Sequence, residues 1–459
     1  MRESARYAWW LLIFLFTLII LGNTALFWTL FFQSEGKGLA SSNQPLGVEF
    51  QVRYALAVER FGLGEETTQS VLKSAFEGMD EAFSPYEAAV YRLIVQSAFS
   101  AGDPKETLRL LPDLPSERLT AAQRRWQAVR LQDALTRPIA PSQVPMVVNS
   151  LGALPSPLAR ELLEITLYQR AGAADKARAL REALAQRAAW GAVLLGAVLG
   201  TGCFAGLAGI RILLWYLLAR LPLPERPAPN ESPFAYDPLL WALVIFLLLR
   251  LNAPVIRETL LVREMMRGVE VTNALYLLAV LLPLMYLLSL RRESGALGQL
   301  RWFQGSVWRQ IGVALMGYAA CVPFLVAMLC LTALLAPALP AEQTNPISER
   351  VSENQGALEW LWTFAQAAVL APIIEEFVFR GVLFQVFWQR TGRVWLSAFA
   401  SGYLFAVIHP QFLGGILPIT VLGTVLALVY AHTRSLLPCI LIHALNNGLI
   451  VLMLWSVAG

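Results

Sequence analysis

The sequence predicts an all-α fold: a polytopic transmembrane helical bundle with an N-terminal anchor helix and an inserted helical soluble domain. Three observations lead to this fold class. Hydrophobic residues make up 56% of the 459 positions and charged residues only 15%, which is too apolar for an ordinary soluble protein. Apolar runs long enough to span a bilayer recur along the chain. One long polar segment with helical periodicity interrupts them.

The first element is an apolar run over residues 7–32, which we interpret as a membrane anchor. A secretory signal peptide is the alternative, but its apolar region is normally about 7–15 residues long and ends in small residues at a cleavage site. Here the run is longer and ends in bulky side chains such as Trp28 and Phe31. We therefore predict an uncleaved anchor over residues 1–32.

Residues 33–188 are predicted to form a helical soluble domain. Apolar residues recur there at spacings of three and four, and short turns at Gly62, Gly102 and Gly172 separate the helices. The stretch 167–180 resembles a tetratricopeptide (TPR-like) helix pair, with an irregular helical bundle as the alternative. No catalytic set of residues appears in this domain, so we expect it to be a surface that binds a protein partner.

Long apolar runs follow, and we interpret them as transmembrane helices. They lie near residues 190–218, 237–256, 271–290, 310–339, 357–389, 394–409, 412–432 and 436–457. With the anchor they give about nine candidate spans. We assign residues 189–309 to transmembrane helices with an interfacial segment around Trp302–Trp308, and residues 310–459 to a C-terminal core.

Net charge and cysteine content limit which partners and which metal or redox sites the sequence can indicate. The net charge of +4 is small for this length and no long basic run occurs, so a nucleic-acid partner is not indicated. The four cysteines all fall in apolar segments, without the paired spacing of a zinc ribbon or a thioredoxin-type site. We expect all four to be buried thiols: Cys203, Cys321, Cys330 and Cys439.

Glu375, Glu376 and Arg380 lie inside an apolar stretch of the C-terminal core. Charged groups at bilayer depth each cost about 3 kcal/mol on insertion scales, so they usually carry function. Glu376 and Arg380 are four residues apart and share one helical face, whereas Glu375 is turned away by about 100°. The spacing predicts an ion pair for Glu376 and leaves Glu375 for chemistry.

The remaining titratable residues limit the chemistry. All three histidines fall after residue 400, and the only acids after Glu359 are the two glutamates just described. The last aspartate is Asp237 and the last lysine is Lys176, so neither an aspartate pair nor a Ser-Lys dyad can form in the C-terminal spans. The common zinc and serine hydrolase motifs are also missing from the sequence. The side chains that remain for catalysis in the C-terminal spans are glutamate and histidine.

Three motifs carry these groups in order along the chain: Glu375-Glu376-x-x-x-Arg380, Phe405-x-x-x-His409 and His443-x-x-x-Asn447. Each lies within an apolar run. The series resembles the CPBP family of intramembrane proteases, which includes the type II CAAX prenyl endopeptidases and bacterial proteins linked to bacteriocin processing and self-immunity. The resemblance covers about residues 310–457.

The resemblance implies roles for these residues. Glu375 and His443 would activate a water molecule to attack a peptide carbonyl. His409 and Asn447 would polarise that carbonyl and stabilise the oxyanion. The other motif residues would support this catalytic set: Glu376, Arg380 and Phe405.

The resemblance also leaves a metal mechanism open, in which Glu375, His409 and His443 bind zinc and a fourth position holds water. We prefer a mechanism without a cofactor, because Asn447 suits an oxyanion role and is a poor zinc ligand. His432, at the end of a span, is expected to be interfacial.

The function that follows is cleavage of a membrane-associated protein or peptide by an intramembrane endopeptidase. The resemblance suggests a lipidated substrate and a multi-pass protein in the bacterial plasma membrane. The alternative is a non-enzymatic scaffold or bacteriocin-immunity protein that binds partners through its helical domain. A transporter is disfavoured, because it predicts polar residues spread through several spans.

Overall fold

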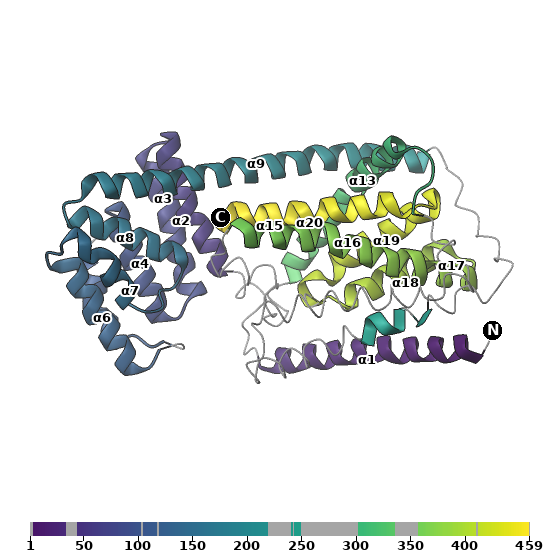
Figure 1. The fold of residues 1–459 in the computed structure, drawn as a ribbon, viewed down its shortest axis with the longest axis horizontal. Coiled ribbons are helices and arrows are strands. Elements are labelled where there is room, and N and C mark those ends of the chain that lie inside the picture. The colour runs from purple at the N-terminus through teal and green to yellow at the C-terminus, as the bar shows by residue number, and fades with distance from the viewer. Residues whose placement is uncertain are drawn as a thin grey trace. The chain divides into compact units, whose positions relative to one another are not determined.

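A computed structural model of the chain describes residues 3–33, 44–101, 104–116, 119–218, 240–241, 243–248, 302–335, 357–409 and 412–458. Within these ranges every regular element is helical and none is a strand (Figure 1), which confirms the all-α class for this part of the chain. The predicted span at 271–290 lies outside the described residues, as does most of the one at 237–256. The chain divides into two compact units, which are described separately.

The helical unit is built mainly from residues 36–201. Its helices are α2 (Gln44–Phe61), α3 (Glu65–Ala82), α4 (Pro85–Phe99), α5 (Pro104–Leu110), α6 (Ala121–Thr136), α7 (Val144–Ser150) and α8 (Pro157–Arg170). The predicted turns at Gly62 and Gly172 separate consecutive helices, with φ of +66° and +75°. Glycine adopts these left-handed conformations without steric cost.

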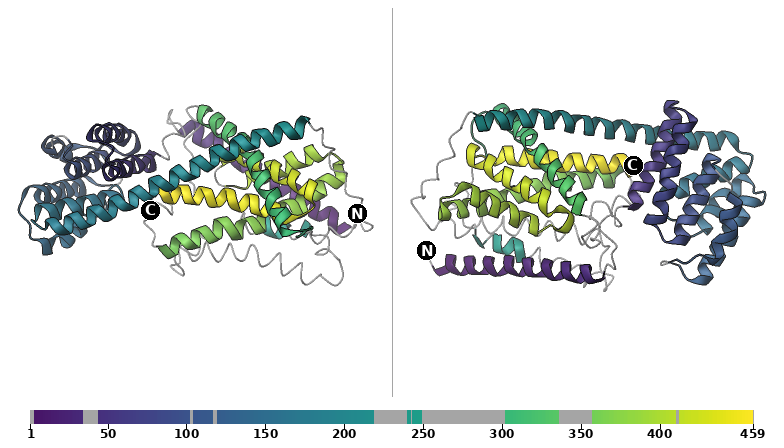
Figure 2. Two further views of the ribbon diagram at one scale, coloured as in Figure 1. Left: turned by 90° about the horizontal axis from the view of Figure 1, so that it is seen from above. Right: turned by 180° about the vertical axis from the view of Figure 1, so that it is seen from behind.

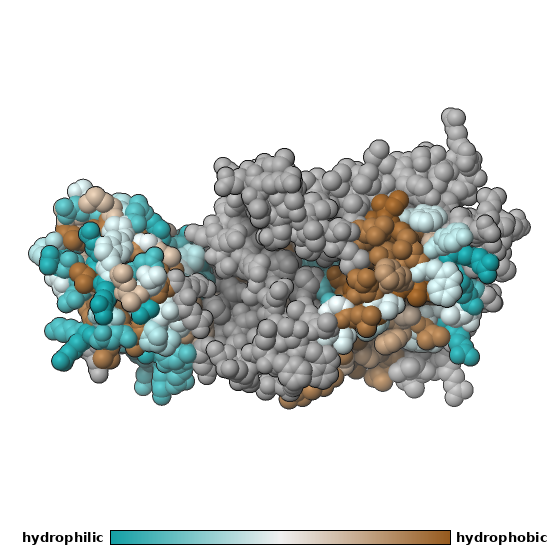
Figure 3. Space-filling model, turned by 90° about the horizontal axis from the view of Figure 1, so that it is seen from below, coloured by the Kyte–Doolittle hydropathy of each residue, from teal (hydrophilic) through white to brown (hydrophobic). Residues whose placement is uncertain are grey.

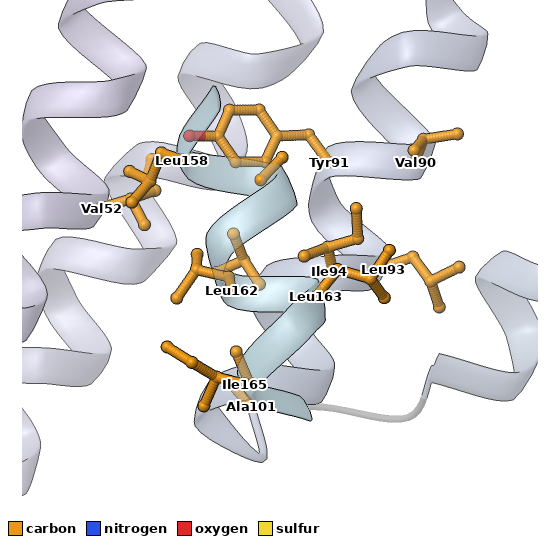
Figure 4. Packing of buried hydrophobic residues seen from close by; sticks show 14 of the residues in the cluster. Val52, Val90, Tyr91, Leu93, Ile94, Ala101, Leu158, Leu162, Leu163 and Ile165 are labelled. Atoms are coloured by element: carbon orange, nitrogen blue, oxygen red, sulfur yellow. The ribbon is translucent and has the colours of Figure 1, made fainter. Parts of the chain in front are cut away.

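Helix α8 supplies the centre of this unit's hydrophobic core. Leu158, Leu162 and Leu163 are fully buried, and their spacing places them on one helical face. They belong to one cluster with Tyr91 and Ile94 of α4, and Figure 4 shows these side chains directed toward one another. The spacing of apolar residues by three and four in the sequence therefore reflects real core packing.

Helix α9 (Ala174–Leu218) is a single helix of 45 residues, uninterrupted in all views (Figure 2). Its N-terminal part buries Ala177 and Leu184 in the core of the helical unit. Its later part exposes large apolar side chains such as Phe204 and Leu207. The change from polar to apolar sequence near residue 188 thus occurs within a helix, because this alanine-rich stretch has strong helical propensity and contains no proline.

Five described helices are long and apolar enough to cross a membrane. They are α1 (Glu3–Gln33), α9, α13 (Val307–Leu335), α19 (Phe412–Thr433) and α20 (Leu436–Ala458). Figure 3 shows a broad hydrophobic area on the other unit, here called the membrane unit and built mainly from residues 1–35, 202–336 and 364–448, whereas the visible face of the helical unit is mixed and mainly hydrophilic. The chain is an integral multi-pass membrane protein.

Close helix packing surrounds the C-terminal motifs. Helix α18 (Val394–Val407) packs along α19, and α19 also contacts α13. A Cβ atom added to Gly402 would lie 2.6 Å from the backbone nitrogen of Thr424, and one added to Gly423 would lie 2.7 Å from the Cα of Gly402. Only glycine permits the two backbones to approach this closely.

Two of the four cysteine predictions are wrong. Cys321 and Cys439 are buried, but Cys203 and Cys330 are exposed. The exposed pair lies on α9 and α13, within candidate membrane spans. Side chains on the outward face of such helices contact lipid, so an apolar sequence context does not imply a position inside the protein.

The predicted interfacial segment around Trp302–Trp308 does not form one continuous helix in the structure. Residues 302–306 are not helical, and α13 begins at Val307. Gly305 has a φ of +77°, which interrupts a helix. The carbonyl of Trp302 instead accepts a hydrogen bond from the backbone nitrogen of Leu437 at 3.2 Å, so this connector is attached to the start of α20.

Candidate active site

The two glutamates lie on a continuous helical run over residues 357–391, here called the glutamate helix, which contains two π-helical segments. It consists of α15 (Ala357–Ala365), the π-helical η6 (Gln366–Leu370), α16 (Ala371–Glu376), the π-helical η7 (Phe377–Phe384) and α17 (Gln385–Thr391). The N–H of Ala371 bonds to the carbonyl of Gln366, five residues back. The next residue, Pro372, has no N–H, so in this register the carbonyl of Ala367 loses its helical donor.

Glu376 forms the predicted ion pair with Arg380. Both side chains are fully buried, and Nη1 of Arg380 donates to Oε1 of Glu376 at 2.7 Å. Nη2 of Arg380 donates to the carbonyl of Gly423 at 3.1 Å. The guanidinium also lies over the ring of Phe405, 4.6 Å from its centroid. Arg380 therefore joins the glutamate helix to α18 and α19.

The same oxygen of Glu376 holds His443, a contact that the sequence did not reveal. Nδ1 of His443 lies 2.8 Å from Oε1 of Glu376. Because Glu376 is paired with Arg380, we assign it as an ionised acceptor, so Nδ1 carries the proton and donates. The other ring nitrogen, Nε2, faces Glu375 and lies 3.7 Å from its Oε2.

His409 lies just after the end of α18 and also faces Glu375. Its Nδ1 lies 2.7 Å from the carbonyl oxygen of Phe405. A carbonyl only accepts, so this contact assigns the proton to Nδ1 and leaves Nε2 directed elsewhere. Nε2 lies 3.9 Å from Oε2 of Glu375. The ring of Phe405 contacts both imidazoles edge to face, with centroids 4.7 Å from His409 and 5.5 Å from His443.

Three proton acceptors thus converge. In their neutral forms both histidines present an Nε2 lone pair toward one carboxylate oxygen of Glu375. Separations of 3.7 and 3.9 Å are too long for direct hydrogen bonds but within reach of one bridging water. The arrangement can bind a water and remove its proton.

Asn447 lies beside the π-helical η6. Its Nδ2 donates to the carbonyl of Ala367 at 2.9 Å, which satisfies the group that Pro372 leaves open. Its Oδ1 lies 3.3 Å from Nδ2 of Asn446. A carboxamide nitrogen carries two protons, so Asn447 retains one N–H for another acceptor.

The described donor atoms do not fit a zinc ion as they stand. Zinc lies about 2.0–2.2 Å from nitrogen and oxygen ligands, so tetrahedral ligand atoms are roughly 3.4 Å apart. The measured separations from Glu375 Oε2 to the two imidazoles are 3.7 and 3.9 Å. Throughout the described ranges, no group of three His, Cys, Asp or Glu side chains is placed to hold a metal.

His432 and Cys439 contact backbone carbonyls of α19 and are not among the side chains that converge on Glu375. His432 is exposed at the end of α19 and bonds through Nδ1 to the carbonyl of Leu428 at 2.8 Å. Cys439 is fully buried, and its thiol contacts the carbonyl of Leu426 at 3.3 Å.

Asn23 lies outside the three motifs that predicted the site from the sequence. This residue of α1 donates through Nδ2 to the carbonyl of Val407 at 2.9 Å, two residues before His409. The available signal was a carboxamide within the N-terminal apolar run, because amides within membrane spans usually bond to another helix.

Comparison with known proteins agrees with these motifs. The family model described as "Type II CAAX prenyl endopeptidase Rce1-like" matches residues 357–449, which include both glutamates, His409, His443 and Asn447. The chain is 28% identical over 87 residues to the "Putative membrane peptidase YdiL" of Bacillus subtilis (strain 168), covering 19% of this chain and 35% of that protein. It is 33% identical over 87 residues to the "UPF0177 protein YaiF" of Lactococcus lactis subsp. lactis (strain IL1403), covering 19% and 38%.

Each match spans little more than a third of the curated relative. No solved structure matches the chain. The family match begins where α15 begins and ends within α20, so it covers the elements that bring the motif residues together. The C-terminal region of this chain, residues 357–449, is therefore a domain of the Rce1-like type II CAAX prenyl endopeptidase (CPBP) family.

Proposed function

We propose that this chain is an intramembrane endopeptidase in which Glu375 and His443 activate a water molecule to hydrolyse a peptide bond. The observation that carries the proposal is the convergence of two imidazole nitrogens on one oxygen of Glu375, at 3.7 and 3.9 Å. Of this set, Glu375 and His443 can bind one water and accept its proton, as general base catalysis requires.

In this proposal the water oxygen attacks the peptide carbonyl carbon and its proton moves to Glu375. His443 contacts the same water through Nε2 and can share the proton. Glu376 keeps Nδ1 of His443 protonated and stabilises the imidazolium when Nε2 gains a proton, as a carboxylate does for a catalytic histidine. The proton then passes to the leaving amine, the peptide C–N bond breaks, and the carboxylate of Glu375 is restored.

The oxyanion would be stabilised by His409 and Asn447. Asn447 has an N–H beyond the one that it donates to Ala367. His409 uses its Nδ1 proton on the carbonyl of Phe405, so its Nε2 can donate only when the ring is an imidazolium. A preorganised donor of this kind typically lowers the activation free energy by about 3 kcal/mol.

The substrate we propose is a membrane-associated protein or peptide, with a lipidated C-terminal region suggested by the domain family. Both of these relatives come from bacteria, and we propose the bacterial plasma membrane as the location. The N-terminal helix would be an uncleaved anchor. The inserted helical domain, with its TPR-like helix pair over 167–180, would bind a protein partner.

The test is a comparison of new peptide termini in membranes from cells that express the wild type, Glu375→Gln, or His432→Gln. His432→Gln is the matched control, because it alters an exposed histidine of the same domain. We expect termini in the wild type and the control, with a loss of about 10²-fold or more in Glu375→Gln. A chelator-treated wild-type sample tests the zinc alternative. Identical termini from the wild type and Glu375→Gln would overturn the proposal and favour a non-enzymatic scaffold.

A further inference from the structure

Helix α1 has a buried face that belongs to the same core as the motif residues. Along α1 the buried residues are Ala8, Leu12, Leu15 and Phe16, at spacings of three and four. They form one hydrophobic cluster with Phe379 of the glutamate helix and Phe405 of α18. A simple anchor would need no such face, because lipid covers an isolated span equally on all sides.

Asn23 extends this face toward the end of α18. It lies seven residues after Phe16, or two helical turns, and is therefore on the same side of α1. Its side chain is half-buried, and Nδ2 donates to the carbonyl of Val407 at 2.9 Å. Helices α1 and α18, 384 residues apart along the chain at this bond, are thus joined by a polar contact within the apolar core.

The carbonyl of Val407 accepts a hydrogen bond from outside its own helix. α18 ends at Val407, so this carbonyl is one of the unsatisfied groups at a helix C-terminus. The N–H of His409 is already bonded to the carbonyl of Ala406 at 3.0 Å. The next residue, Pro410, has no N–H. In a bilayer an unsatisfied backbone carbonyl is costly, and Asn23 removes that cost.

We infer that Asn23 is a positioning residue for His409, and that α1 is a structural part of the active site rather than only an anchor. The role in catalysis rests on the proposed function. Asn23 fixes the backbone two residues before His409, and the imidazole bonds back to Phe405 within the same last turns of α18. Release of the Val407 carbonyl would let this turn unwind and move Nε2 of His409 away from Glu375.

The first experiment measures the imidazoles directly. The chain has only three histidines, so isotope-labelled histidine gives three assignable sets of ring-nitrogen NMR signals, with His409→Gln and His432→Gln variants for assignment. Asn23→Leu removes the donor at similar volume, and we expect the His409 signals to shift while those of His432 stay unchanged. Thr24→Val is the matched control, because the Thr24 hydroxyl bonds to Ile20 within its own helix at 2.8 Å.

The second experiment measures cleavage. Asn23→Leu should lower kcat about tenfold with KM nearly unchanged, since misplacement of a catalytic group by about 1 Å can cost up to 10²-fold. Asn23→Gln keeps the amide donor and should lie between Asn23→Leu and the wild type. If Asn23→Leu does not accumulate in membranes, Asn23→Ala replaces it in both experiments.

The outcomes separate the two proposals. Unchanged His409 signals in the Asn23 variant overturn the positioning role, whatever the cleavage rate. A shift of the same size in Thr24→Val also overturns it, because the effect would then be general to α1. If the His409 signals shift but Glu375→Gln cleaves like the wild type, the proposed catalytic role of Glu375 fails while the positioning of His409 by Asn23 stands.

Discussion

The two hydrogen bonds that converge on one oxygen of Glu376 allow its structural and catalytic roles to be separated. Oε1 accepts from Arg380 at 2.7 Å and from His443 at 2.8 Å, and the side chain is fully buried. Glu376→Gln keeps the shape but removes the charge. Its amide can also donate to Nδ1 of His443, which would move the imidazole proton to Nε2, the atom that must accept a proton.

Two losses of different size are expected from Glu376→Gln. The unpaired guanidinium of Arg380 remains buried, and removal of one partner of a buried ion pair typically destabilises a protein by about 3–5 kcal/mol. Cleavage should fall by about 10²- to 10⁴-fold, because His443 in the wrong tautomer can no longer share the proton of the water with Glu375. The assays are thermal unfolding of the purified full chain in detergent and cleavage rate per folded molecule.

The double variant Glu376→Gln, Arg380→Met distinguishes these effects. It removes the unpaired buried charge, so much of the lost stability should return. His443 still lacks its carboxylate, so cleavage should stay low. Recovery of cleavage together with stability would refute the orientation argument and reduce Glu376 to a folding role. Glu375→Gln is the opposite control: it should lose cleavage with little change in stability, since Glu375 is outside the arginine pair.

Two further predictions concern packing and pH. Gly423→Ala places a Cβ 2.7 Å from the Cα of Gly402 and should lower the free energy of unfolding by about 1–3 kcal/mol, measured by thermal unfolding. Gly196→Ala is the control: its Cβ would have no atom within 4 Å, so its free energy of unfolding should stay near that of the wild type. In the helical unit, burial raises the pKa of Glu49 above its ordinary value of 4.5, and Arg53 opposes the shift. The stability that this carboxyl contributes to the folded state is therefore complete below about pH 4.5. It is lost as pH rises through the folded-state pKa. The unfolding temperature of Glu49→Gln minus that of the wild type should therefore increase from about pH 4.5 upward; a constant difference would contradict the assignment.

Sequence spacing predicted the local geometry of the site but not its distant contacts. The four-residue spacing of Glu376 and Arg380 was enough to predict their ion pair, because helical periodicity fixes which neighbours share a face. The bond between Glu376 and His443 joins residues 67 apart, and periodicity carries no information on which helices meet. The family resemblance indicated that the motifs gather at one site, but not that one glutamate faces both imidazoles while the other holds His443.

The π-helical segments were also not predictable from the sequence. A proline within a helix, such as Pro372, indicates only a local disturbance, whereas the structure accommodates it with a π-helical segment before the two glutamates. A proline removes one donor in any case, but neighbouring helices decide whether the chain kinks, breaks or widens. The same holds for α9, where a change in composition looked like a domain boundary and the backbone continued as a helix.

The site is built around backbone groups that proline leaves open. Pro372 leaves the carbonyl of Ala367 without its donor, and Asn447 satisfies it; Pro410 cannot serve the carbonyl of Val407, and Asn23 satisfies that one. In water either carbonyl could bind solvent, but within a bilayer each needs a protein donor. Each opening lies next to a residue of the proposed catalytic set. We therefore expect loss of either asparagine to reduce folding stability and cleavage together.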